Sequence, residues 1–280
     1  MYRLSALCAA ALLAACSNVP SPEAATQAQG APGRHLPDVQ AQCRNGDTQV
    51  IGAYKYENNM WGADKARGFT PEQCLLTRTV NGSKQVGWTW YWPGMDRSVF
   101  AYPQIMWGWK PWSGGKPSDA RFPMRVGDLK SLTMDFDVQT DARGTYNLAP
   151  EIWLTRSGAW SDAPNPKLIT TEIMFWMDYQ QGATPAGSIV DRPVINGVTY
   201  ELWKMDNIGN KGDGTGWTIY SFKSPTIQHT GRIDIQALLA YMVAKGWASK
   251  DEYVASVEFG NEVMGGSGTT WVKRFEVTAN

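Results

Sequence analysis

The sequence predicts an all-β fold, on three observations. Short segments in which apolar and polar residues alternate, or which are rich in β-branched and aromatic residues, recur along the chain. The stretch 233–245 is the one convincing helical pattern outside the N-terminus, and it ends at Gly246. A length of 280 residues suits a single β-sandwich or barrel with a short tail.

Residues 1–16 are expected to be an export signal and not part of the fold. Arg3 supplies a short positive start, and residues 4–15 form an apolar run that is too short to span a bilayer. The run ends in Leu13-Ala14-Ala15-Cys16, which resembles a bacterial lipobox in which Cys16 is lipidated. An ordinary cleaved signal or a short membrane anchor is the alternative.

Residues 17–37 are rich in Ala, Pro, Gln and Ser, which predicts a flexible linker before a folded domain at 38–280. The resemblance to lipoproteins implies outer-membrane sorting, because Ser17 follows the lipobox cysteine. We therefore expect an exported protein of a bacterial cell envelope, either an outer-membrane lipoprotein or a secreted protein. Its only expected contact with a membrane is the lipid at Cys16.

The strand expected at 170–176 carries a carboxylate on an otherwise apolar face. Because side chains alternate along a strand, Glu172, Met174 and Trp176 share one face, and an ordinary core face lies behind them. An acid in that position must be paired with another group or take part in chemistry.

A second strand, expected at 256–264, has the same feature. Glu258 and Glu262 share one face with Gly260 between them, and the opposite face is apolar apart from Asn261. Glycine at 260 is expected where a ligand approaches the backbone. Two glutamates on separate strands, each flanked by Met and aromatic residues, predict paired-carboxylate hydrolysis of a glycosidic bond.

Both strands resemble the signatures of glycoside hydrolase family 12, the small jelly-roll endoglucanases. Residues 171–176 resemble the family's "E-I-M-I-W" strand, and residues 259–268 resemble its second signature, roughly "A-G-x-E-I-W-x-G-G-x-G". The resemblance implies a jelly-roll β-sandwich of two antiparallel sheets with an open concave cleft and one helix. It also implies that Glu172 is the nucleophile and Glu262 the general acid/base. The sequence departs from the family at Val263-Met264, where Ile-Trp is common.

A third strand, around 146–154, carries a rival carboxylate. Glu151 stands where the family usually has an Asp that is hydrogen-bonded to the nucleophile, and Asn147 shares its face. Glu151 is the alternative nucleophile, because Glu151-Ile152-Trp153 resembles a truncated copy of the later motif. As a supporting carboxylate it could share a proton with Glu172 and tune both pKa values.

The resemblance also implies residues that bind substrate. The segment 58–62 resembles the family's "N-N-x-W-G", which binds glucose on the non-reducing side of the cut, although the bare residues favour a turn Asn and a core Trp. The loop around 180–187 resembles one that lines the cleft. The substrate-binding residues implied in this way are Asn59, Trp61, Asn147, Met174, Trp176 and Pro185.

The cysteines divide by their position in the chain. Cys8 lies in the signal and Cys16 at the expected lipid site, which leaves Cys43 and Cys74 as a pair. In an exported protein such a pair predicts a disulfide, and two free buried thiols are the alternative.

Composition argues against several other functions. A formal net charge of +0 gives no basic footprint for nucleic acid. His35 and His229 are isolated and no Cys, His and Asp cluster has metal-ligand spacing, so no metal is expected. No Gly-rich loop stands at a strand-to-helix junction, so no nucleotide cofactor is expected either.

The function predicted from the sequence is retaining, endo-acting hydrolysis of β-1,4-glucan by a monomer. Xyloglucan preference is the alternative within the enzyme class. Outside it, the alternatives are a non-catalytic carbohydrate-binding jelly roll and a surface lipoprotein that binds a partner. A lectin needs no opposed pair such as Glu172 and Glu262, so the presence of both favours an enzyme.

Overall fold

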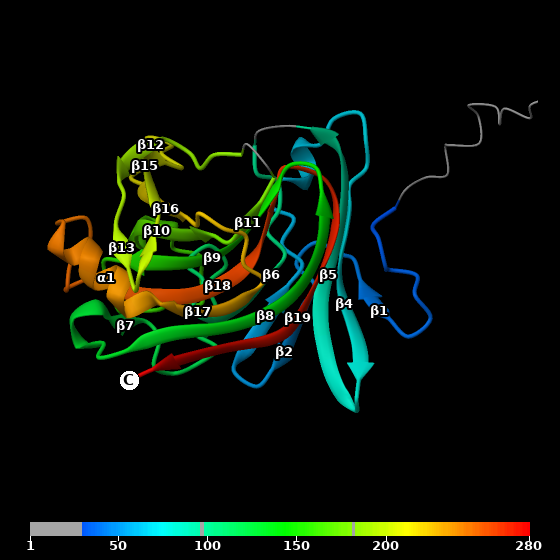
Figure 1. Ribbon diagram of the computed structural model, residues 1–280, viewed down its shortest axis with the longest axis horizontal. Helices are drawn as coiled ribbons and strands as arrows, with labels where there is room; N and C mark the ends of the chain where they lie inside the picture. Colours follow the sequence, from blue (N-terminus) through cyan, green and yellow to red (C-terminus); the bar gives the residue numbers. More distant parts are fainter. Residues whose placement is uncertain (1–29, 96–97, 181–182) are drawn as a thin grey trace, which may run out of the picture.

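Two large sheets face each other across one core in the computed structural model, which describes residues 30–95, 98–180 and 183–280 (Figure 1). The predicted lipobox Cys16 lies outside the described residues. In spatial order the smaller sheet consists of β1 (Gln40–Gln42), β4 (Glu72–Val80), β5 (Ser83–Met95), β19 (Gly265–Ala279), β8 (Leu132–Arg143) and β17 (Thr230–Asp234).

The larger sheet carries all three carboxylate strands side by side. In spatial order it consists of β12 (Ser188–Asp191), β15 (Glu201–Ile208), β16 (Trp217–Lys223), β10 (Ile169–Trp176), β9 (Tyr146–Thr155), β18 (Tyr253–Val263), β6 (Gln104–Gly108), β3 (Tyr54–Glu57) and β2 (Thr48–Ile51). Short strands β11 (Asp178–Tyr179) and β7 (Met124–Arg125) pair with β9 and β18, and β13 (Val194–Ile195) pairs with β14 (Val198–Thr199). The predicted all-β sandwich is confirmed.

One strand pair departs from the antiparallel pattern that was predicted. β10 and β16 run parallel, with Thr171 beside Thr218 and Trp176 beside Lys223. Parallel neighbours need a long crossover, and here the chain passes through β11 to β15 between them. The larger sheet is therefore mixed.

Alternation along the strands builds the core. Ile173 and Phe175 of β10 and Phe259 of β18 point between the sheets and belong to one buried cluster, as predicted. The polar exception, Asn261, is fully buried, and its Oδ1 accepts hydrogen bonds from Trp88 Nε1 and Thr270 Oγ1, both at 2.8 Å. These bonds connect β18 to β5, which carries Trp88, and to β19, which carries Thr270.

The one α-helix in the described part of the chain, α1 (Ile235–Ala244), lies close to its predicted position. Asp234 caps it by accepting a hydrogen bond from the Ala237 backbone N–H at 2.9 Å. The apolar positions that predicted the helix face inward, and they are Ile235, Leu238, Leu239 and Met242. Short 3₁₀ turns occupy Ala63–Lys65, Val126–Asp128 and Pro166–Leu168. Among the described residues, no helix has the length and apolar character needed to cross a membrane.

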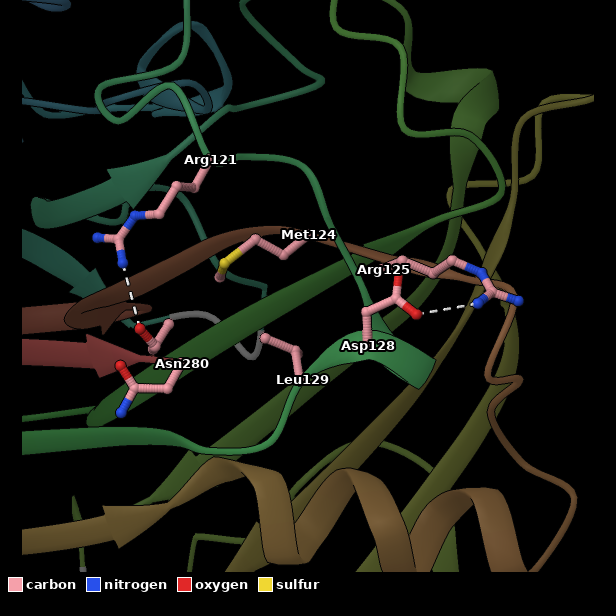
Figure 2. Close-up of a pocket in the computed structure, with 7 residues that line it drawn as sticks. Arg121, Met124, Arg125, Asp128, Leu129 and Asn280 are labelled. Carbon is pink, nitrogen blue, oxygen red and sulfur yellow. Dashed lines mark hydrogen bonds and ion pairs between the residues drawn. The ribbon is translucent and has the colours of Figure 1, made fainter.

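A cavity of about 260 Å³ lies at the C-terminal edge of the sandwich (Figure 2). Arg121 and Arg125 line it, and Arg121 donates to the Ala279 carbonyl at 3.2 Å. A second cavity, of about 510 Å³, lies between β2 and β3 on one side and β5 and β19 on the other. None of the predicted site residues lines either cavity.

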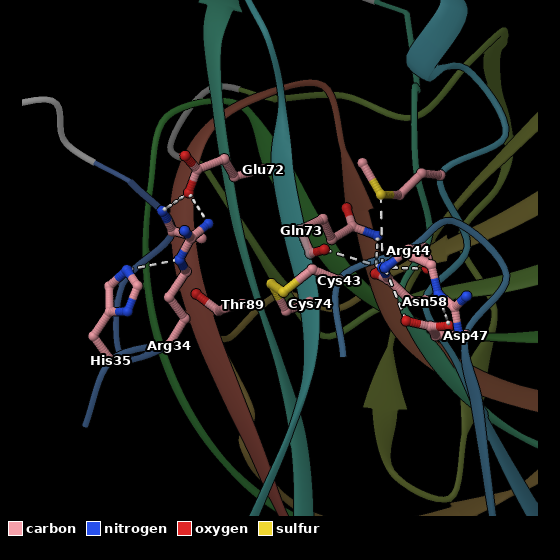
Figure 3. Close-up of a disulfide and its surroundings, with 12 residues drawn as sticks. Arg34, His35, Cys43, Arg44, Asp47, Asn58, Glu72, Gln73, Cys74 and Thr89 are labelled. Atoms are coloured by element: carbon pink, nitrogen blue, oxygen red, sulfur yellow. Dashed lines mark hydrogen bonds and ion pairs between the residues drawn. A yellow bond between two sulfur atoms is a disulfide. The ribbon is translucent and has the colours of Figure 1, made fainter. Parts of the chain in front are cut away.

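The predicted disulfide between Cys43 and Cys74 is confirmed (Figure 3). It ties the chain after β1 to β4, and Cys74 is fully buried. Nearby, the Asn58 side chain donates to the carbonyl oxygens of Arg44 and Gln73, both at 3.0 Å. The covalent bond and these hydrogen bonds fix the start of the segment that leads to Trp61.

Part of the range predicted as linker lies against the domain. The Arg34 guanidinium contacts Glu72 at 2.6 Å, and the Pro32 carbonyl accepts a hydrogen bond from Thr89 Oγ1 at 2.6 Å. Ala31 is buried, and its backbone N–H donates to Glu72 at 3.1 Å. Residues 31–34 thus contact β4 and β5, inside the range predicted as linker.

Candidate active site

The register of β10, β9 and β18 brings four glutamates onto one face of the larger sheet, which we call the carboxylate face. Glu151 lies opposite both Met174 and Glu258, at the centre of the group. Glu172 lies opposite Trp153, towards one end of β9, and Glu262 lies opposite Asn147, towards the other. These side chains alternate with core residues, so they point away from the smaller sheet.

Glu172 is nearly inaccessible to solvent, at 6% exposure. Its Oε2 accepts a hydrogen bond from Trp217 Nε1 at 2.7 Å. Burial and the negative charge of Glu262 raise the pKa of Glu172 to about 8, against the opposing effect of the Trp217 hydrogen bond. This carboxylate therefore has a fixed orientation and holds its proton more tightly than an ordinary glutamic acid.

Glu262 is partly exposed and is held by a neighbouring amide. Asn147 Nδ2 donates a hydrogen bond to its Oε2. Burial of the carboxyl raises the pKa of Glu262 to about 7, and the Asn147 hydrogen bond limits the rise. The pair Glu172 and Glu262 thus titrates near neutrality, where an acid/base catalyst is most effective.

Glu151 stays close to the two, as predicted for a supporting carboxylate. It is 5% exposed. Burial and the charges of Glu172, Glu262 and Glu258 raise its pKa well above the ordinary value. Glu151 therefore holds its proton more tightly than an ordinary glutamic acid does.

Several buried polar atoms on this face have no partner in the described part of the protein. They are Asn147 Oδ1, Trp153 Nε1, Trp176 Nε1 and Gln104 Oε1. Buried polar atoms are almost always hydrogen-bonded, and sugar hydroxyls can serve both as donors and as acceptors. The four atoms are inaccessible to solvent, so a sugar hydroxyl can reach them only if neighbouring side chains move.

The predicted substrate residues differ in how they are placed. Trp61 is 49% exposed, which rules out the core alternative, and the Lys65 ammonium lies 4.7 Å from its ring centre. Asn59 follows β3, and its carbonyl accepts from the Tyr102 backbone N–H at 2.9 Å. Met174 and Trp176 are buried together in one cluster on the carboxylate face.

Pro185 is buried in the loop that follows β11. Lys223 Nζ donates to the Ala183 carbonyl of this loop at 2.7 Å and lies 4.5 Å from the Tyr179 ring. These contacts fix the loop beside the strand that carries Trp176.

Position 260 requires glycine for a different reason from the one predicted. A Cβ at this position would lie 2.4 Å from the Pro103 carbonyl oxygen and 3.0 Å from the Tyr102 ring. The close approach is therefore to the chain entering β6 and not to a ligand. The glycine allows β6 to pack tightly against β18.

The structure adds residues to which no sequence pattern assigns a role. Lys110 forms a buried ion pair with Glu258, and Trp217 holds Glu172. The alternation of β18 had already placed Glu258 beside Glu262, whereas nothing in the local pattern links Lys110 or Trp217 to the glutamates. Among the described residues, no group of His, Cys, Asp and Glu is arranged to hold a metal ion.

Comparisons with known proteins agree with this geometry. The family model described as glycosyl hydrolase family 12 matches residues 52–280. The chain is 31% identical to Endoglucanase S of Pectobacterium parmentieri, over 82% of this chain and 84% of that protein. It is 26% identical to a probable xyloglucan-specific endo-beta-1,4-glucanase A of Aspergillus clavatus, over 80% and 85% of the two chains.

A solved structure shares the same fold. A family 12 xyloglucanase from Bacillus licheniformis, in complex with ligand, superposes with a TM-score of 0.76 at 32% identity and covers 86% of this chain and all (100%) of that one. Matches of this extent in sequence and in fold show that the protein is a glycoside hydrolase and that it belongs to glycosyl hydrolase family 12.

Proposed function

We propose that the protein cleaves β-1,4-glucan chains internally and retains the anomeric configuration, with Glu172 as nucleophile and Glu262 as general acid/base. The observation that carries the proposal is that Glu172 and Glu262 share one face of the larger sheet, each held by its own hydrogen-bond donor. In such a reaction one carboxylate attacks the anomeric carbon while the other protonates the leaving oxygen.

The proposed roles need the proton on Glu262 and the negative charge on Glu172, whereas burial leaves Glu172 with the higher pKa, about 8 against about 7. The charge of Glu262 raises the pKa of Glu172, so the two carboxyls titrate as a coupled pair and not independently. When the proton is on Glu262, the charge that raises the pKa of Glu172 is gone, and the Trp217 hydrogen bond favours the ionised nucleophile. Once Glu172 is esterified, Glu262 loses its proton more readily and can activate water.

Glu172→Gln and Glu262→Gln are each expected to remove most turnover while sugar binding persists, because the amide keeps the shape of the side chain and loses its chemistry. Reducing-sugar release from carboxymethylcellulose, mixed-linkage β-glucan and xyloglucan measures turnover, and NMR of the first-formed anomer tests retention. Glu276→Gln, at an exposed position of β19, is the matched control. Full activity in Glu172→Gln or in Glu262→Gln, or a first product of inverted anomeric configuration, would refute the proposal.

Xyloglucan is the second candidate substrate, because two of the similar proteins are named as xyloglucan-active enzymes. The same assay separates the candidates by the ratio of kcat/KM on xyloglucan to that on unbranched glucan. A ratio well above one assigns the branched polymer as the preferred substrate.

We also propose that Cys16 carries a lipid that anchors the protein in the cell envelope, on the strength of the lipobox resemblance alone. Metabolic labelling with a fatty acid is expected to mark the wild-type protein and not Cys16→Ser. Cys8→Ser is the matched control, and equal labelling of wild type and Cys16→Ser would exclude the anchor.

A further inference from the structure

A buried ion pair lies within the carboxylate face. Lys110 Nζ and Glu258 Oε2 are 3.0 Å apart, and the two side chains are 8% and 0% exposed. The second oxygen of Glu258 accepts a hydrogen bond from Ser256 Oγ at 2.9 Å. Among the residues that the structure describes, Lys110 is the only buried side chain with a permanent positive charge.

The lysine is held rigidly at its base. The Trp109 backbone N–H donates to the Ala255 carbonyl at 2.7 Å. The Lys110 carbonyl accepts from the backbone N–H groups of Ser113 and Gly114, at 3.2 and 3.0 Å. A lysine fixed in this way directs its ammonium to one place and does not sample the solvent as a surface lysine does.

Stability alone gives little reason for the pair. Removing two charges from water costs several kcal/mol per ion, on the order of what their attraction returns, and apolar replacements of buried pairs are often neutral. The position of the pair is more informative, because Glu258 lies opposite Glu151 in the register and on the same face as Glu262.

We propose that Lys110 and Glu258 are a positioning pair for hydrolysis. The positive charge of Lys110 stabilises negative charge on the carboxylate face, and the negative charge of Glu258 partly cancels this effect at Glu172 and Glu151. The inference rests on the roles proposed above for Glu172 and Glu262. Neither Lys110 nor Glu258 is required to touch the substrate.

The electrostatic effects have the signs that this role requires. The positive charge of Lys110 lowers the pKa of Glu151 and of Glu172, whereas the negative charge of Glu258 raises both. Burial alone would lower the pKa of Lys110, but the charges of Glu258 and Glu57 raise it, so Lys110 stays protonated. The titratable groups that face the pair or its targets are Glu57 on β3, Tyr102 before β6, Glu151 on β9, Glu172 on β10 and Glu262 on β18.

The test compares the acid limb of the kcat/KM pH profile in two single variants. Glu258→Gln keeps the shape of the side chain and removes its charge, so the acid limb is expected to move to lower pH, because Glu172 ionises more easily. Lys110→Met removes the positive charge and is expected to move the limb to higher pH. A shift of about 0.5 to 1 pH unit is expected in each, less than a directly paired charge produces.

Two further variants separate charge from structure. Lys110→Arg keeps the positive charge and is expected to leave the limb near its wild-type position. The double variant Lys110→Met with Glu258→Gln removes both charges and is expected to return the limb towards wild type. A merely structural role would lower activity in the single variants without moving the limb in opposite directions.

A direct titration of the glutamate carboxyls by ¹³C NMR makes the result independent of turnover. It is expected to show the pKa of Glu172 falling in Glu258→Gln and rising in Lys110→Met. If Lys110→Met does not fold, the direction of the shift in Glu258→Gln decides. An unchanged or raised pKa of Glu172 in Glu258→Gln overturns the positioning role, whereas full turnover in Glu172→Gln would overturn the proposed function instead.

Discussion

The environment of each glutamate, more than its identity, sets what it can do. Glu172 and Glu151 are both buried carboxyls on neighbouring strands, yet Glu172 accepts an indole hydrogen bond and Glu151 is surrounded by other negative charges. The Trp217 hydrogen bond favours ionisation of Glu172, although burial and Glu262 still raise its pKa, whereas the charges of three other glutamates oppose ionisation of Glu151. This difference supports the proposal that Glu172 is the nucleophile and Glu151 a supporting carboxyl.

Trp217→Phe tests the indole hydrogen bond. The ring is retained, but the donor to Glu172 is lost, so the pKa of Glu172 rises and the acid limb of the pH profile moves to higher pH. A hydrogen bond to a charged group contributes about 1.5 to 3 kcal/mol, so kcat/KM near pH 6 is expected to fall by about 10-fold or more. Trp160→Phe, at an exposed loop position, is the control, and equal profiles in the two variants would contradict the role of Trp217.

At the scale of elements, β18 connects the core to the site. Its inward Asn261 bonds to strands of the smaller sheet, while its outward Glu258 and Glu262 lie on the carboxylate face. The strand can serve both functions because successive side chains point to opposite faces. Its spacing from β6 depends on the absence of a side chain at Gly260.

Gly260→Ala is expected to destabilise the protein by about 1 to 3 kcal/mol, because the added methyl overlaps the Pro103 carbonyl and pushes β6 away from β18. Denaturant unfolding measures the loss, and kcat/KM is expected to fall as well. Gly231→Ala in β17 is the matched control, since its nearest neighbour would lie 3.5 Å from the new Cβ. If both variants were equally stable, the close approach of Pro103 to Gly260 would not explain why glycine is needed there.

At the scale of the whole molecule, the site is built at a cost to stability. Three acids with raised pKa values lie on one face, two of them buried, and the sandwich behind them supplies the compensating packing. The disulfide joins the chain after β1 to β4, and residues 31–34 contact β4 and β5, at one edge of the smaller sheet.

The free energy of unfolding is therefore expected to fall as pH rises from about 5 to 8. In this window the folded protein keeps protons on Glu172 and Glu262 that the unfolded chain, with glutamate pKa values near 4.5, has released. More protons on the folded state mean stability that is present at low pH and lost as pH rises through the folded pKa. Each proton contributes a slope of up to about 1.4 kcal/mol per pH unit.

Urea unfolding at several pH values measures this slope. The double variant Glu172→Gln with Glu262→Gln is expected to be less dependent on pH and relatively more stable at pH 8, because its amides carry no charge to bury. A steeper dependence in the double variant would contradict the burial argument.

The sequence determined the fold class, the helix, the disulfide and the faces of the carboxylate strands. Each of these depends on local patterns, namely the period of two along β10 and β18, the helical period at 235–242 and the count of cysteines. The family resemblance rested on the same short motifs, and the family match confirms it.

Only the tertiary structure decided what surrounds each glutamate. Lys110 and Glu258 are 148 positions apart in the chain, and Trp217 and Glu172 are 45 apart, so no local pattern joins them. The parallel pairing of β10 with β16, and the contact of Gly260 with Pro103, also depend on segments that are far apart in the chain. Alternation along a strand fixes which way a side chain points, but which strand lies beside it, and hence which charges it meets, depends on how the whole sheet is ordered.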